Sequence, residues 1–273
     1  MPTVTVSDIS IYYETHGEGE PLLLIMGYGG NCRWWNSQIP ALSQEYRVVA
    51  FDNRGAGRSD KPDVPYTIEM MAADTAGLLE ALAIDAAHIY GVSMGGMIAQ
   101  ELTLRHPDKV ISLILGCTTP GGPNSILADA ETLTFLFDTE RRKRLTQEED
   151  ARETLPYLFT QEFMDKNPEL MDAVVASMLE YDVTPIHGYQ RQGEAIMRLN
   201  AYDRLTEIKA PTLVIAGTAD RLIPVENSRL LASRIPDAEL VILEDVGHGF
   251  FTEALEEASK AVLAFLGRHR RSA

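Results

Sequence analysis

The sequence feature that most constrains the fold is a five-residue segment, Gly-Val-Ser-Met-Gly, at positions 91–95. A short apolar run at 87–90 precedes the segment, and a helical pattern follows it over 94–105 and stops at Pro107. Glycines two positions before and two positions after the serine remove side chains that would collide in a sharp turn. This is the spacing of a serine nucleophile held between a strand and a helix. The segment therefore predicts a strand, a tight turn carrying an exposed hydroxyl, and a helix.

Apolar segments and helical patterns alternate along most of the chain. Strands are predicted at 21–26, 47–51, 88–90, 110–115, 212–216 and 239–243, after an antiparallel hairpin of residues 4–7 and 9–14. Helices are predicted at 35–44, 67–83, 94–105, 225–235 and 252–266. Continuously apolar strands are typical of a parallel sheet covered on both faces. The sequence therefore predicts an α/β fold with a mostly parallel sheet between two layers of helices.

The alternation stops between residue 121 and about residue 200, where helical patterns follow one another. We expect an all-helical insertion at 121–195 and a core formed by 1–120 and 196–273. An apolar stripe at 170–179 favours a small core inside the insertion over the lining of a substrate pocket. The run of alternating charges at 140–150 is typical of a solvated helix face.

Charge and cysteine content narrow the class of protein. The formal net charge of −16 disfavours binding to nucleic acid or to anionic lipid and favours a small neutral or apolar partner. Two cysteines, Cys32 and Cys117, are too few for a disulfide framework and show no metal-ligand spacing, which favours a cytoplasmic protein without a bound metal. Residues 1–13 lack the features of a signal peptide. The oligomeric state is left open.

A serine hydroxyl needs a neighbouring base to act as a nucleophile at neutral pH. The chain has six histidines, and His248 is the one in a glycine-flanked loop directly after the last predicted strand. Loops at the ends of parallel strands are where α/β proteins place their sites. We therefore expect His248 to be the base for Ser93.

The base in turn needs a carboxylate to orient it. Asp220 follows the predicted strand 212–216 and lies between Ser93 and His248 in the chain. The competing loop, after the strand 110–115, contains no acid. Asp220 is the preferred candidate, and three others stay open: Asp203, Glu244 and Asp245.

A serine mechanism also needs donors for the oxyanion of the tetrahedral intermediate. One is expected from the backbone amide of Met94, at the start of a helix whose dipole favours negative charge. The second is expected from Tyr28, in a loop of four residues, 27–30, that contains three glycines. Such a loop after a buried strand indicates close approach of backbone to a ligand.

Taken together, these motifs resemble the α/β-hydrolase family. The resemblance covers nearly the whole chain: the glycine loop, a segment from Asp52 to Ser59, the turn at 91–95, and the serine, acid, histidine order. It implies an eight-stranded, mostly parallel sheet with a helical cap at 121–195 and a cofactor-free reaction. The segment from Asp52 to Ser59 is then structural. One departure is Met26, where many relatives carry a histidine that supports the oxyanion loop.

The resemblance implies a carboxylic ester hydrolase working through an acyl-enzyme. Alternatives are a 3-oxoadipate enol-lactonase, which residues 61–93 resemble, a carbon–carbon bond hydrolase, a perhydrolase and an acyltransferase. A non-catalytic ligand-binding protein of the same fold is the alternative from another class. Substrate choice is expected to depend on the cap and on side chains such as Trp34, Trp35, Phe159 and Tyr189. For Trp34 and Trp35, packing in the aromatic core is an equally good interpretation.

Overall fold

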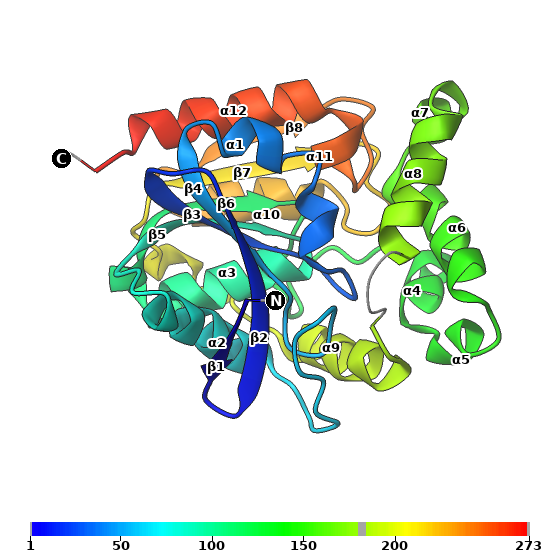
Figure 1. Cartoon of the computed structure of the whole chain (residues 1–273). Helices are drawn as coiled ribbons and strands as arrows, with labels where there is room; N and C mark the ends of the chain where they lie inside the picture. The colour runs from blue at the N-terminus through cyan, green and yellow to red at the C-terminus, as the bar shows by residue number, and fades with distance from the viewer. Residues whose placement is uncertain (1, 180–183, 272–273) are drawn as a thin grey trace.

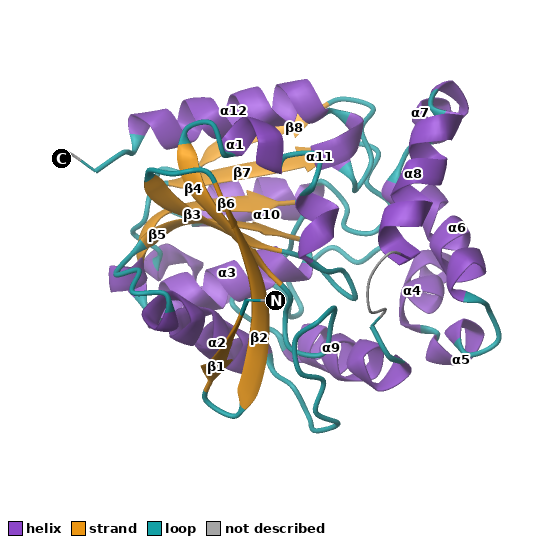
Figure 2. Ribbon diagram, in the orientation of Figure 1, coloured by secondary structure: helices purple, strands orange, loops and turns teal. Residues whose placement is uncertain are grey.

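The computed structural model describes residues 2–179 and 184–271 and contains one eight-stranded sheet (Figures 1 and 2). The strand order is β1-β2-β4-β3-β5-β6-β7-β8. The first two strands pair antiparallel, as do β2 and β4, and all other neighbours are parallel. The strands are β1 Thr3–Val6, β2 Ile9–His16, β3 Glu20–Ile25, β4 Tyr46–Phe51, β5 Ala87–Val92, β6 Val110–Gly116, β7 Thr212–Gly217 and β8 Glu239–Leu243. The predicted α/β fold is confirmed.

Two hydrophobic clusters lie on opposite faces of the sheet, because successive strand residues point to opposite sides. On one face, Leu23 and Ile25 pack with helices α2 (Ile68–Ala81), α3 (Met94–Arg105) and α10 (Glu226–Arg234). On the other, Leu22 and Leu24 pack with α1 (Ile39–Leu42) and α12 (Leu255–Arg268), as Figure 1 shows. Burial on both faces explains why these strands read as continuous apolar runs.

Two predicted helices are each broken in two, which corrects the sequence analysis. The helix expected at 35–44 is a 3₁₀ turn η1 at Cys32–Trp35 followed by α1, whose first turn contains Pro40. Proline starts a new helix readily because it has no amide hydrogen to satisfy. The helix expected at 252–266 is α11 (Phe250–Glu253) and α12, separated by Ala254 with φ −120° and ψ 49°.

The segment between β6 and β7 consists of a loop at 117–129 followed, in the residues described, mainly by helices. It contains α4 Ala130–Phe137, α5 Thr139–Arg142, α6 Gln147–Leu158, α7 Gln161–Lys166, α8 Pro168–Leu179 and α9 Ile186–Arg198. The expected boundary at 195 lies inside α9. A single bridge pairs Gly121 with Asn200, so the chain leaves and rejoins the core at one point.

Short 3₁₀ turns complete the elements, η2 at Pro107–Lys109 and η3 at Tyr202–Glu207. Within residues 2–179 and 184–271, none of the helices combines the length and apolar character needed to span a bilayer.

Candidate active site

Ser93 occupies the sharp turn between β5 and α3. Its backbone has φ 57° and ψ −124°, a region that non-glycine residues rarely occupy, and its hydroxyl does not cap the helix. A Cβ on Gly91 would lie 2.2 Å from the carbonyl oxygen of Gly95, and a Cβ on Gly95 would lie 2.0 Å from that of Ile25. Both glycines are therefore required sterically, and the turn keeps the Ser93 hydroxyl free of the helix end.

The glycine loop after β3 lies directly against Ser93. A Cβ on Gly27 would be 2.9 Å from Ser93 Cβ and 3.4 Å from Ser93 Oγ. In the part of the chain described, neither the Tyr28 nor the Met94 backbone amide donates a hydrogen bond to another residue. Both candidate oxyanion donors are thus near the nucleophile without a protein acceptor.

The segment after β4 supports this loop. The Asn53 side chain donates to the carbonyl oxygen of Met26 at 2.7 Å, and Asp52 accepts from the amides of Cys32 and Arg58, each at 2.7 Å. Arg54 forms a buried ion pair with Asp74, 2.7 Å between Nε and Oδ2. These contacts agree with the structural role expected for residues 52–59.

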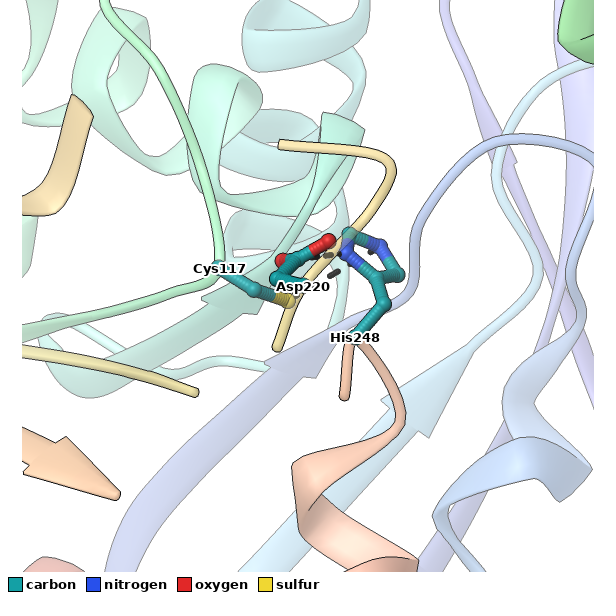
Figure 3. A group of neighbouring side chains, drawn as sticks. All are labelled: Cys117, Asp220 and His248. Carbon is teal, nitrogen blue, oxygen red and sulfur yellow. Dashed lines mark hydrogen bonds and ion pairs between the residues drawn. The ribbon is translucent and has the colours of Figure 1, made fainter. Parts of the chain in front are cut away.

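Asp220 and His248 meet at the carboxyl ends of β7 and β8 (Figure 3). His248 Nδ1 and Asp220 Oδ2 are 2.8 Å apart, and both residues are buried. The other carboxylate oxygen of Asp220 accepts from the amides of Leu222 at 2.8 Å and Ile223 at 2.9 Å. The carboxylate is thus fixed by the backbone and orients the imidazole.

Electrostatics favour protonation of His248. Burial opposes the charged imidazole, whereas the adjacent Asp220 carboxylate and the Cys117 sulfur favour it, and together they hold the pKa of His248 well above its ordinary value. Burial raises the pKa of the Cys117 thiol, which is therefore neutral at neutral pH. The pair of His248 and Asp220 has the arrangement of a base and its orienting acid.

Ser93 and His248 both line a cavity of about 710 Å³. No hydrogen bond joins Ser93 Oγ to His248 Nε2 in the described chain; Nε2 lies 3.8 Å from Cys117 Sγ instead. Catalytic hydrogen bonds of ligand-free enzymes are commonly long and tighten when substrate binds. Asp203, Glu244 and Asp245, the other candidate acids, make no hydrogen bond to His248 in the residues described.

In the described part of the chain, one group of side chains has donor atoms close enough for a metal ion. Single donor atoms of Cys117, Asp220 and His248 all lie within 4.8 Å of one another. Asp220 already uses both of its oxygens, Oδ1 for the amides of Leu222 and Ile223 and Oδ2 for His248 Nδ1. We therefore treat the three residues as a hydrogen-bonded group.

The cavity walls come from the core loops and from the α4–α9 segment. Trp34 and Tyr189 line it, as expected, whereas Trp35 is fully buried against Tyr90 and Phe251. Phe159 belongs to a separate cluster inside the helical segment.

The apolar stripe of α8 divides between two roles. Met171 and Val175 are buried in the cluster inside the helical segment, and Met178 and Leu179 line the cavity. Leu170 is 39% exposed. The stripe is therefore partly internal core and partly pocket wall.

Three residues at the site were missed by sequence reasoning. Arg142 and Asp150 line the cavity, which corrects the prediction that the charged run at 140–150 is only a solvated face. Gln192 is fully buried on α9, where it accepts from the Gly29 amide at 2.9 Å and donates to the Arg54 carbonyl at 2.8 Å. Nothing in the local sequence distinguishes these residues from surface residues of a helix.

Known proteins similar to this chain match it over most of its length. The family model of the alpha/beta hydrolase fold matches residues 20–255. A candidate carbamate hydrolase, RutD, of Azorhizobium caulinodans is 32% identical over 98% of both chains. A candidate non-heme bromoperoxidase, BpoC, of Mycobacterium tuberculosis is 33% identical over 94% of this chain and 97% of its own.

Solved structures agree with these relatives. The crystal structure of the enol-lactonase from Burkholderia xenovorans superposes with a TM-score of 0.86 at 29% identity, covering 97% of this chain and all of its own. The chain thus belongs to the α/β-hydrolase family and is a hydrolase of that family.

Proposed function

We propose that the protein cleaves carboxylic esters through an acyl-enzyme, with Ser93 as nucleophile, His248 as base and Asp220 as the orienting acid. The observation that carries the proposal is the 2.8 Å hydrogen bond between His248 and Asp220 at the wall of the cavity that Ser93 also lines. The reaction needs only side chains and backbone amides, so no cofactor or metal is required.

The proposed chemistry follows in two halves. Ser93 Oγ attacks the acyl carbon while His248 Nε2 takes its proton, and the imidazolium then protonates the leaving alkoxide. The amides of Tyr28 and Met94 stabilise the oxyanion. In the second half His248 activates water, which attacks the acyl-enzyme and releases the acid and Ser93. For the first step the imidazole has to turn from Cys117 towards Ser93, and the bound substrate supplies the close packing that favours this position.

A fluorophosphonate probe tests the nucleophile directly. We expect the probe to label the wild-type chain at Ser93 and Ser93→Ala to abolish labelling. His248→Ala is expected to lower ester turnover by several orders of magnitude, on the order of what triad deletions cost in other enzymes.

The same experiment separates the proposal from its rivals. Absence of labelling in a folded protein would contradict the serine mechanism and favour a non-catalytic binding protein. A near-normal rate in His248→Ala would remove that residue from its role. If an added alcohol or thiol outcompetes water for the acyl-enzyme, the protein is an acyltransferase.

Enol-lactone hydrolysis is the second candidate. The enol-lactonase from Burkholderia xenovorans resembles this chain along its whole length, and a lactone is an internal ester open to the same steps. p-Nitrophenyl esters of increasing length, assayed beside an enol-lactone, a carbamate and an aromatic ring-fission product, distinguish the substrate classes by kcat/KM.

A further inference from the structure

The charge inside the cavity comes from very few side chains. Among the described residues that line it, Arg142 and Asp150 are the only Lys, Arg, Asp or Glu. Their side chains are 7% and 19% exposed. Among the described residues His248 also lines the cavity, and the remaining walls are mainly apolar. Arg142 and Asp150 are therefore the guanidinium and the carboxylate that a charged substrate meets there.

The two charges neutralise each other. Arg142 Nη1 donates to Asp150 Oδ2, and Arg141 Nη2 donates to Asp150 Oδ1 at 2.6 Å. Arg141 in turn pairs with Glu153, which does not line the cavity. The four groups, two cations and two anions, have no net formal charge.

Aromatic contacts connect this ion pair to the loop beside Ser93, within the same cavity. The Arg142 guanidinium carbon lies 4.2 Å from the centre of the Tyr189 ring. Tyr189 contacts Tyr28 edge to face, with ring centres 5.3 Å apart. Tyr28 belongs to the loop beside Ser93, so a substrate acylating Ser93 shares its cavity with Arg142.

We propose that Asp150 makes the cavity selective for substrates with an uncharged acyl chain, by occupying the guanidinium that would otherwise bind a carboxylate. This rests on the proposed ester hydrolysis and specifies its substrate class. A carboxylate entering the cavity has to lose its hydration shell, and the Arg142 charge is already compensated. A neutral chain has no such cost and gains from the apolar walls.

If Asp150 lost its charge, Arg142 would be free to bind the carboxylate of a substrate. Without the Asp150 charge, the guanidinium offers its donors to a bidentate anion. Removing one negative charge at residue 150 is therefore expected to reverse the preference.

The test compares matched substrates on one enzyme preparation. p-Nitrophenyl hexanoate and mono-p-nitrophenyl adipate share a six-carbon acyl chain and differ in a terminal carboxylate, and octanoate and suberate repeat the comparison at eight carbons. In the wild type we expect kcat/KM for each half-ester to be at most one-tenth of that for the neutral ester. Asp150→Asn is expected to raise this ratio at least tenfold, about 1.4 kcal/mol in relative transition-state binding. The ratio is independent of the folded fraction.

Two further variants isolate the cause. Glu153→Gln makes the same charge change on the same network outside the cavity, and its ratio should stay within twofold of the wild type. Arg142→Met in the Asp150→Asn background should abolish the gain. If Asp150→Asn does not fold, Arg142→Met alone should lower the wild-type ratio at least threefold.

The outcomes are distinguishable from failure of the proposed function. Equal wild-type rates on hexanoate and adipate, or an unchanged ratio in folded Asp150→Asn, overturn the selectivity proposal while ester hydrolysis stands. Absence of both ester turnover and fluorophosphonate labelling overturns ester hydrolysis and the selectivity proposal with it.

Discussion

Asp220 uses its two carboxylate oxygens for two separate tasks. Oδ1 accepts two backbone amides from the following turn, and Oδ2 accepts from His248. The backbone thus fixes the position of the carboxylate whether or not the imidazole is in place. The carboxylate can therefore hold the imidazole in one orientation. This arrangement preorganises the base before substrate arrives.

The activity should depend on pH through the protonation of His248. In the proposed mechanism turnover needs a neutral His248. Since Asp220 raises the pKa of His248, activity should fall as the pH drops through that raised value. Asp220→Asn removes the attraction but leaves the burial, which lowers the pKa. We expect the acidic limb of kcat/KM to move to lower pH and the rate to fall on the order of 10³- to 10⁴-fold. A pH–rate profile of both proteins measures this.

Asp245→Asn is the matched control. Asp245 is exposed in the loop that carries His248, so its substitution makes the same charge change near the site. Its acidic limb should coincide with that of the wild type. An unmoved limb in Asp220→Asn would show that another group controls the pH dependence.

The three residues of the proposed site were predictable from the sequence because each lies in a short motif of its own. Ser93 has a glycine two positions to either side, His248 lies between two glycines, and Asp220 lies in the turn that follows β7. Arg142 and Gln192 were not predictable, because their burial depends on how helices pack, and a helix sequence does not record which charged residue faces a cavity. The acid at 220 could be preferred but not proved, since aspartate is common in turns.

At the scale of elements, the contact between α3 and β3 depends on Gly95. A Cβ there would meet the Ile25 backbone, which cannot move without displacing a central strand. We expect Gly95→Ala to lower the free energy of unfolding by at least about 2 kcal/mol. Urea unfolding curves give this value.

Gly267→Ala provides the comparison, because a Cβ at that position meets nothing within 4 Å on α12. Its unfolding free energy should be unchanged or raised by less than about 1 kcal/mol. Similar losses in both variants would refute the steric account of the turn.

The strands and helices were predicted correctly where the spacing of apolar residues matches the faces that are buried in the structure. The strands are apolar on both faces and short, so their existence follows from the sequence. The breaks at residues 36–38 and at Ala254 were missed because the apolar pattern runs through them. The first break precedes Pro40, which is a local signal in the sequence. The second lies at Ala254, whose φ of −120° and ψ of 49° depart from helical values without any such signal in the residue type.

Across the whole molecule, Gln192 joins the helical segment to the glycine loop at 27–30, which carries a proposed oxyanion donor. Its amide group joins Gly29 to Arg54 from α9. Gln192→Met removes both hydrogen bonds at similar volume and leaves the Gly29 amide unpaired. We expect kcat to fall about tenfold or more with a smaller change in KM, because the oxyanion loop loses its fixed position.

Gln190→Met, exposed on the same helix, is the matched variant. Steady-state kinetics and the rate of fluorophosphonate labelling should both decline in the Gln192 variant and not in the Gln190 variant. Equal rates in the two proteins would limit Gln192 to a structural role.

The bridge between Gly121 and Asn200 brings the two ends of the helical segment side by side. Because the polypeptide departs and returns through adjacent positions, everything between them can be lengthened, shortened or exchanged without altering the sheet. Ser93, Asp220 and His248 all lie outside that excursion, whereas Arg142 and Asp150 lie within it. The groups proposed for reactivity and those proposed for selectivity thus lie in separable stretches of the gene. A graft joined at these two positions that keeps the contacts of Gln192 with Gly29 and Arg54 would be expected to alter selectivity while preserving reactivity.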